Sequence, residues 1–309
     1  MKKSTKISLL VSLALVLAGA LMIFISLLGV GFDMRNFSDM TFEKKVFDIT
    51  DSFEVVHIIE ETDDIELYPS DEKTCKIVCY DSDRTYHECF VDKKSDKLEK
   101  NYLRVLYRDE RAWYEKIMPL FKGDRKVQIY LPEKAYNELA VSSVNSDISV
   151  PSDFTFDKAN IHTVNGKIGL NANITKWVSV EATNGEINLS GEISGKIHAD
   201  TVNGKITAKN IKSAETADFS TTNGNIELDG DTVVYLCAHS TNGSIKFGTT
   251  VSDRIDIETV NGSITGTVVP DKKCVGRSVN GNVSVPNKVD SNGDYYFKTV
   301  NGNIDIKEK

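Results

Sequence analysis

The chain has 309 residues, a formal net charge of −8 and an isoelectric point of about 5.3. Its basic residues are scattered among acidic ones and form no stripe, which argues against a nucleic acid as partner. A hydrophobic content of 40% is ordinary and suits a globular or solenoid domain.

A stretch without charged residues, 7–32, follows a short segment, 1–6, that contains three lysines. The stretch is longer than the roughly 7–15 residues of a secretory hydrophobic region, and it can span a bilayer, which needs about 20. The lysines favour a cytoplasmic N-terminus. We therefore expect an uncleaved, single-pass signal anchor in a cell membrane, with residues 33–309 extracytoplasmic. A cleaved signal peptide is the alternative.

The segment after the predicted anchor divides into a short polar tether, 33–46, and a β-rich region, 47–140. Alternating apolar and polar residues in this region predict strands, for example at 126–131, and charge-rich turns separate them. The region shows no repeat. Because open sheet edges invite aggregation, we expect it to form an irregular β cap over the first edge of the structure that follows.

The five cysteines are Cys75, Cys79, Cys89, Cys237 and Cys274. Cys79 and Cys89 flank a polar turn and could lie opposite each other in a hairpin. An extracytoplasmic location would permit a disulfide there, although two separate thiols fit the sequence equally well. Cys237 and Cys274 are interpreted as small core residues. There is no C-x-x-C pair, so a zinc site has no support. The histidines share no metal-ligand spacing either, and no cofactor is predicted.

Within residues 141–309 a hexapeptide close to T-V-N-G-x-I occurs nine times, at spacings of 19 to 21 residues. Its asparagines are Asn145, Asn165, Asn184, Asn203, Asn223, Asn242, Asn261, Asn280 and Asn301. A period this regular predicts a single-stranded β-solenoid (a β-helix) with one turn per repeat of about 19 residues.

Each repeat alternates with the strand period of two, with apolar or small residues facing inward. Asn-Gly tolerates positive φ and would form the corner between two strand segments. Successive corners would stack about 4.8 Å apart, close enough for the asparagine side chains to hydrogen-bond as a ladder. We interpret all nine asparagines as structural residues that fix the register.

Catalysis is not expected. A polysaccharide-active β-helix needs acidic or basic residues clustered at outward sites, and the outward charges here alternate in sign along the stack. The neighbouring pair Glu181 and Asp200, and Glu258 near Arg277, are interpreted as solvated surface charges. No P-loop, dinucleotide fingerprint or Ser/His/Asp order is present.

The chain ends shortly after its last repeat, with Lys307, Glu308 and Lys309. We expect these charges to protect the terminal solenoid edge from pairing with other chains. Self-association or partner binding through this C-terminal edge is the alternative.

The anchor, the segment 127–132 and the serial T-V-N-G-x-I turns resemble the bacterial putative-adhesin domain family, a domain of unknown function, over residues 47–309. The resemblance implies a β-helix on the cell surface, as on Gram-positive bacteria, and supplies no catalytic residues. We expect a membrane-anchored, adhesin-like binding or scaffold module for an envelope polymer, glycan or protein. Some relatives are linked to envelope stress, so an accessory or sensory part of such a signalling system is one alternative. A polysaccharide-active enzyme is another.

Overall fold

The computed structural model describes residues 19, 21–22, 24–25, 40–94, 99–113, 124–212, 215–230 and 232–309. The chain divides into two units, residues 1–42 with 111–123 and residues 43–110 with 124–309, and the second unit is described below. Most of the predicted anchor, 7–32, and of the predicted tether, 33–46, lies outside the described residues. In the part of the chain that is described, no helix is long and apolar enough to cross a membrane.

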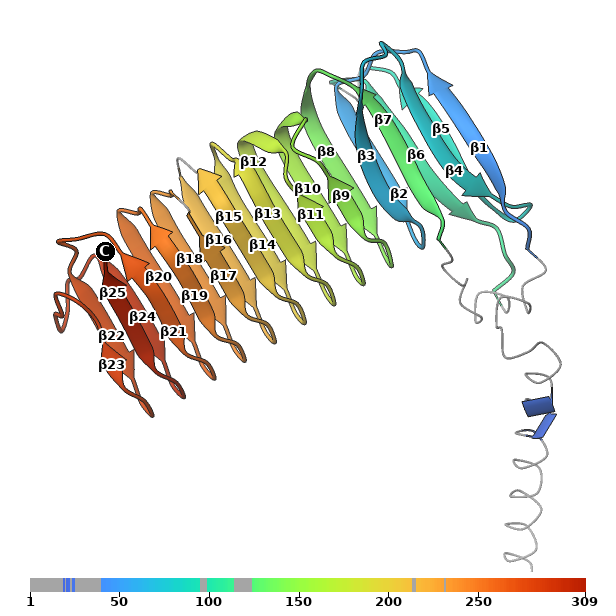
Figure 1. Cartoon of the computed structure of the whole chain (residues 1–309). Coiled ribbons are helices and arrows are strands. Elements are labelled where there is room, and N and C mark those ends of the chain that lie inside the picture. Colours follow the sequence, from blue (N-terminus) through green and yellow to red (C-terminus); the bar gives the residue numbers. More distant parts are fainter. Residues whose placement is uncertain are drawn as a thin grey trace, which may run out of the picture. The chain divides into compact units, whose positions relative to one another are not determined.

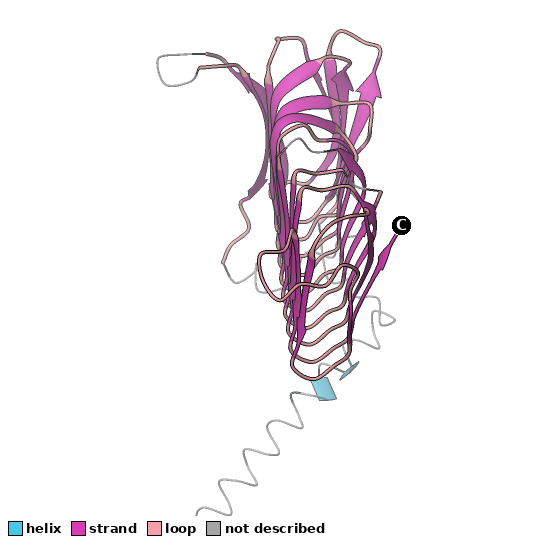
Figure 2. Ribbon diagram, turned by 90° about the vertical axis from the view of Figure 1, so that its left-hand side faces the viewer, coloured by secondary structure: helices cyan, strands magenta, loops and turns pink. Residues whose placement is uncertain are grey.

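The strands of the described residues form two sheets that face each other across a core (Figure 2). In spatial order, sheet A contains β1 (Glu43–Ile49), β4 (Cys75–Asp81), β7 (Lys126–Pro132), β3 (Asp64–Ser70), β9 (Ile148–Val150), β11 (Ile168–Leu170), β13 (Ile187–Glu192), β15 (Ile206–Lys212), β17 (Ile226–Asp229), β19 (Ile245–Thr250), β21 (Ile264–Val268), β25 (Ile304–Glu308) and β23 (Val283–Ser284). Sheet B contains β22 (Cys274–Ser278), β24 (Tyr295–Thr299), β20 (Arg254–Thr259), β18 (Tyr235–Ser240), β16 (Thr216–Thr221), β14 (Lys196–Thr201), β12 (Asn173–Ala182), β10 (Thr155–Thr163), β8 (Ala135–Ser143), β2 (Val55–Glu60), β6 (Tyr102–Asp109) and β5 (Thr85–Asp92).

From β8 onward each repeat forms one rung, which is a strand of sheet B, an asparagine corner and a strand of sheet A (Figure 1). Neighbouring rungs pair in parallel and in register, so that Ile187 stacks on Ile206 and Ile206 on Ile226. These isoleucines, three residues after each corner asparagine, are fully buried. The alternation therefore gives the predicted all-β solenoid, with a core of stacked like residues between the sheets.

The last two repeats do not stack in chain order, contrary to the expectation from the sequence. Strands β24 and β25, which contain the last repeat, lie between β20/β21 and the rung formed by β22 and β23. The chain therefore passes over one rung position, forms the outermost rung and returns to fill the gap. The terminal edge of the solenoid is β22/β23 and not the C-terminal segment.

Side-chain size explains this order. Tyr295 and Phe297 of the inserted rung are fully buried, and the Phe297 ring stacks on Phe247 with ring centroids 5.8 Å apart. In the outermost rung the corresponding residues are smaller. A Cβ on Gly276 would lie 2.6 Å from a methyl carbon of Val283, so the two sheets close together at this end. The bulky aromatic residues are thus enclosed, and the tapered rung covers them.

The N-terminal end shows a similar change of order. We call strands β1–β7 the cap and strands β8–β25 the repeat region. In the cap, the rung of β2 and β3 lies between β6/β7 and the first repeat rung, β8/β9. Outside β6/β7, the strands β4, β5 and β1 pair antiparallel to their neighbours. The cap therefore continues the two sheets of the repeat region and ends them with antiparallel strands.

Candidate functional site

The nine corner asparagines form one continuous ladder of side-chain hydrogen bonds. From Asn165 onward, each amide nitrogen donates to the side-chain oxygen of a neighbouring asparagine over 2.7–2.9 Å. In space the ladder runs Asn145, Asn165, Asn184, Asn203, Asn223, Asn242, Asn261, Asn301 and Asn280. The amide side chains thus hydrogen-bond to one another along one line of the solenoid.

A second ladder explains the threonine or serine two residues before most of the asparagines. The hydroxyl of Thr221, for example, donates to the carbonyl oxygen of Gly204 in the preceding rung over 3.1 Å. Thr201, Ser240, Thr259, Ser278 and Thr299 make the same bond to corner glycines. Glycine is required at the corner because a Cβ on Gly224 would lie 1.7 Å from the Gly204 oxygen. The T-x-N-G signature therefore encodes contacts between rungs. Its hydroxyl and amide groups are already hydrogen-bonded to neighbouring rungs.

The outer face of sheet B carries a hollow near the C-terminal end of the solenoid. It has a volume of about 620 Å³ and lies over β20, β24 and β22. A second, smaller hollow of about 290 Å³ continues it across β16 and β18, and Glu258, Lys298 and Val300 line both. Together they make an extended depression that crosses several rungs.

Charged, aromatic and apolar side chains line this depression. The guanidinium carbon of Arg254 lies 5.2 Å from the ring centroid of Tyr235 and 6.0 Å from that of Tyr296. Arg277 donates to the carbonyl oxygen of Asp290 over 3.1 Å. Val279 is 73% exposed at the rim. The larger hollow thus combines basic side chains, the acidic side chains of Asp256 and Glu258, a ring face and an apolar rim.

The inserted rung separates two residues that the sequence places side by side. Glu258 on β20 and Arg277 on β22 are not neighbours, because Lys298 of β24 lies between their strands. The Lys298 ammonium pairs with Glu258 at 3.3 Å. Glu181 and Asp200 do lie opposite each other on β12 and β14, as expected from the repeat.

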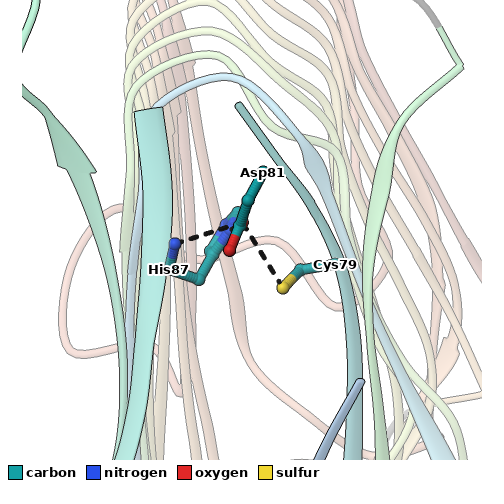
Figure 3. Close-up of side chains that lie close together, drawn as sticks. All are labelled: Cys79, Asp81 and His87. Atoms are coloured by element: carbon teal, nitrogen blue, oxygen red, sulfur yellow. Dashed lines mark hydrogen bonds and ion pairs between the residues drawn. The ribbon is translucent and has the colours of Figure 1, made fainter. Parts of the chain in front are cut away.

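A cluster of buried polar side chains lies inside the cap. His87 of β5 points toward β4, where Cys79 and Asp81 point back toward it (Figure 3). The His87 Nδ1 atom lies 2.7 Å from Asp81 Oδ1, and the Cys79 thiol donates to the same oxygen over 3.7 Å. The other ring nitrogen, Nε2, lies 2.8 Å from Glu60 Oε2. The side chains of His87 and Glu60 are fully shielded from solvent.

Electrostatics make His87 a cation in this arrangement. Burial alone would lower its pKa, but hydrogen bonds to Asp81, Cys79 and Glu60 raise the pKa of His87 to about 12. The neutral thiol of Cys79 is favoured in turn, because a hydrogen bond with Cys89 and burial raise its pKa. The cluster therefore holds one imidazolium between two carboxylates, with thiols beside it.

Cys79 and Cys89, for which the sequence left a disulfide and two separate thiols open, are free thiols in the structure. The two cysteines are not paired across one hairpin, because β4 belongs to sheet A and β5 to sheet B. They face each other across the core. Cys274 is buried as expected, whereas Cys237 is partly exposed on the outer face of sheet B.

The His87 cluster has only a weak signal in the sequence and was not among the predicted sites. Cys79 and Asp81 are two residues apart on one strand and both face inward, and His87 is inward on the next strand. A second group of possible metal-ligand side chains, Asp218, Cys237 and His239, lies partly exposed on β16 and β18. Neither group follows a zinc-ligand spacing along the chain.

Comparisons with known proteins identify the fold. The model of the family described as Toastrack DUF4097 matches residues 54–307. A crystal structure of a putative adhesin from Parabacteroides merdae ATCC 43184 is similar, with 16% identity, a TM-score of 0.52 and coverage of 86% of this chain and 96% of that one. A putative adhesin from Parabacteroides distasonis ATCC 8503 gives 16% identity, a TM-score of 0.51 and coverage of 88% and 98%. No curated protein matches the chain.

Proposed function

This chain belongs to the Toastrack DUF4097 family, a domain family of unknown function, and we propose that the chain is a non-enzymatic, adhesin-like binding module of the cell envelope. The two similar solved proteins support this proposal, since each is described as a putative adhesin. At 16% identity they share the fold with this chain, and the binding role is our inference.

The depression on the outer face of sheet B carries the proposal. It extends over several rungs, which suits an elongated ligand better than a small molecule. Arg254 and Arg277 offer donors for carboxylate or phosphate groups, and the Tyr296 ring offers a surface for apolar contact. We infer that the ligand is an extended envelope polymer with anionic groups, bound along this face.

The acidic residues of the depression suit binding better than catalysis. The Glu258 side chain is 42% exposed and is paired with Lys298. A general acid for glycoside cleavage needs a carboxyl group shielded from water, so that its pKa rises toward neutrality. Glu258 is instead open to solvent and paired with a cation, which supports a non-enzymatic role.

Attachment to the membrane is part of the proposal. The uncharged segment 7–32 would anchor the chain, with its N-terminus in the cytoplasm and residues 33–309 outside the cell. Held there, the solenoid would present the depression to polymers of the envelope.

Binding of the full chain to purified envelope fractions and glycan arrays tests the proposal. The double variant Arg254→Ala/Arg277→Ala should weaken binding at least about tenfold, because two charged contacts are lost. Lys246→Ala, on the outer face of sheet A, is the matched control and should leave binding unchanged. Circular dichroism checks that each variant folds.

Absence of saturable binding to every fraction would contradict the proposal and favour the accessory or sensory role in envelope stress. Equal losses in the sheet B variant and in the sheet A control would show that the depression is not the binding surface.

A further inference from the structure

The buried cluster of the cap brings together three kinds of metal ligand. The ligand atoms of Cys79, Asp81 and His87 all lie within 4.8 Å of one another, and all three residues are buried. They come from strands of opposite sheets, β4 and β5, so the core itself sets their spacing. We propose that these three side chains bind a zinc ion inside the cap.

The chemistry of the donors selects the metal. A thiolate sulfur, an imidazole nitrogen and a carboxylate oxygen are the ligands that zinc uses in proteins. Calcium and magnesium prefer oxygen ligands throughout, and a cysteine beside the ion disfavours them. The burial of all three residues makes this a structural site and not a catalytic one, because a catalytic zinc keeps one position open to solvent.

Glu60 completes the arrangement from the other side of the imidazole. Its Oε2 atom lies 2.8 Å from His87 Nε2, while its Oε1 atom accepts hydrogen bonds from the backbone N–H groups of Glu61, Thr62 and Asp63 over 3.0–3.2 Å. The carboxylate is therefore fixed, and it turns Nδ1 of His87 toward Cys79 and Asp81. A metal-binding histidine commonly donates its second N–H to a carboxylate in this way.

Cys89, whose thiol is hydrogen-bonded to that of Cys79, lies outside the group of three ligand atoms and would move toward the ion to become the fourth ligand. Zinc would replace the thiol protons of Cys79 and Cys89 and the Nδ1 proton of His87. Three protons leave as one ion of charge +2 enters, and the Nε2–H group keeps its bond to Glu60. Two thiols that face each other outside the cell would be protected from oxidation by the metal.

The full chain, freed of metal by a chelator and titrated with zinc under reducing conditions, tests the site. We expect one zinc ion per chain, and cobalt in its place should give the near-ultraviolet absorption of a thiolate ligand. Cys79→Ser and His87→Gln should each weaken binding by about 100-fold or more, and Glu60→Gln, which acts through His87, by about 10–100-fold.

Cys237→Ser is the matched control, because Cys237 belongs to the exposed group with Asp218 and His239. It should leave the affinity and the cobalt spectrum unchanged. Zinc binding that survives Cys79→Ser, or that is lost in Cys237→Ser, would overturn the assignment.

The unmodified chain gives a second test that does not depend on variants that fold. Zinc should raise its melting temperature in proportion to the logarithm of the free zinc concentration, and magnesium should not. The proposal would be overturned if the melting temperature did not respond to zinc and elemental analysis found no bound metal. The cluster would then be only a buried group of ion pairs in the cap.

Discussion

The cap and the repeat region share two continuous sheets but are stabilised in different ways. In the repeat region most rungs use the same corner asparagine, hydroxyl bond and buried isoleucine, so each rung depends mainly on its two neighbours. In the cap, one buried group of charged side chains joins β2, β4 and β5, and among the described residues no other rung contains a copy of it. Loss of one contact should therefore act locally in the repeats, whereas in the cap it should destabilise the whole region.

The largest expected effect is in the cap. His87→Ala, measured in chelator, leaves the buried carboxylates of Glu60 and Asp81 without their cation, and it should cost about 3–5 kcal/mol of unfolding free energy. Denaturant unfolding measures the loss. The control His162→Ala removes a histidine that is 47% exposed beside Glu181 in the repeat region, and it should change stability by less than about 0.5 kcal/mol. Similar costs for both variants would remove the distinction between the regions.

A corner glycine should give the next largest effect. The Cβ of Gly224→Ala would lie 1.7 Å from the Gly204 oxygen, so the rungs must move apart, at a cost of about 1–3 kcal/mol. Gly169→Ala is the matched control, because the nearest heavy atom to its Cβ is 3.8 Å away, and its effect should stay within about 0.5 kcal/mol. Thermal and urea unfolding compare the two. If the control were as damaging as Gly224→Ala, close contact between corners would not be the cause.

The asparagine ladder gives a smaller effect that depends on position. Asn223→Ala removes two hydrogen bonds, to Asn203 and from Asn242, and should cost about 1 kcal/mol. Asn280→Ala, at the end of the ladder, removes only the bond to Asn301 and should cost about half as much.

Asn301→Ala tests the order of the last two rungs. In the structure Asn301 bonds to Asn261 and Asn280, so its loss should match that of Asn223. A smaller cost for Asn301→Ala than for Asn280→Ala in urea unfolding would show that the rungs stack in chain order.

The smallest effect concerns a charged contact between two rungs of the repeat region. Asp157 accepts hydrogen bonds from Lys176 and Thr175 of the next rung, and these bonds lower its pKa to about 2 from the usual 3.8. Because the folded-state pKa is depressed, the stabilisation is complete above about pH 4 and is lost as the pH falls toward 2. For this partly exposed group it is about 0.5 kcal/mol.

Melting temperatures of the natural chain and of Asp157→Asn, measured from pH 7 down to pH 2, check this prediction. The difference between them should shrink below about pH 4 and vanish near pH 2. A difference that grew with acidity would contradict the direction of the pKa change.

The sequence predicts the repeat region well because its contacts are periodic. Alternation around Asn223 places Phe219 and Thr221 inward and predicts a corner, and the period predicts which residues stack. It does not predict the position of the rung with Tyr295, because every rung presents the same pairing edge to every other. The space available in the core decides which rung position is occupied. This space is known only once the side chain of Tyr295 and the backbone of Gly276 are placed against their neighbours.

The His87 cluster was not predictable for a different reason. It joins Glu60, Asp81 and His87, which come from three strands without a period, and the turn between β4 and β5 sends those strands to opposite sheets. A hairpin within one sheet was the simpler expectation. The alternation of Cys79 and Asp81 is also what any half-buried strand would show.

The inserted rungs have a mechanical consequence. A strand at the edge of a sheet can be peeled away one hydrogen bond at a time, whereas a strand between two neighbours must break both of its ladders together. Tension applied at Lys309 acts first on β25, which is held between β21 and β23. Near the other end, β3 is held between β7 and β9 in the same way. Tension at the C-terminal end must therefore break two ladders together, whereas tension at the N-terminal end acts first on β1, an edge strand that pairs only with β4.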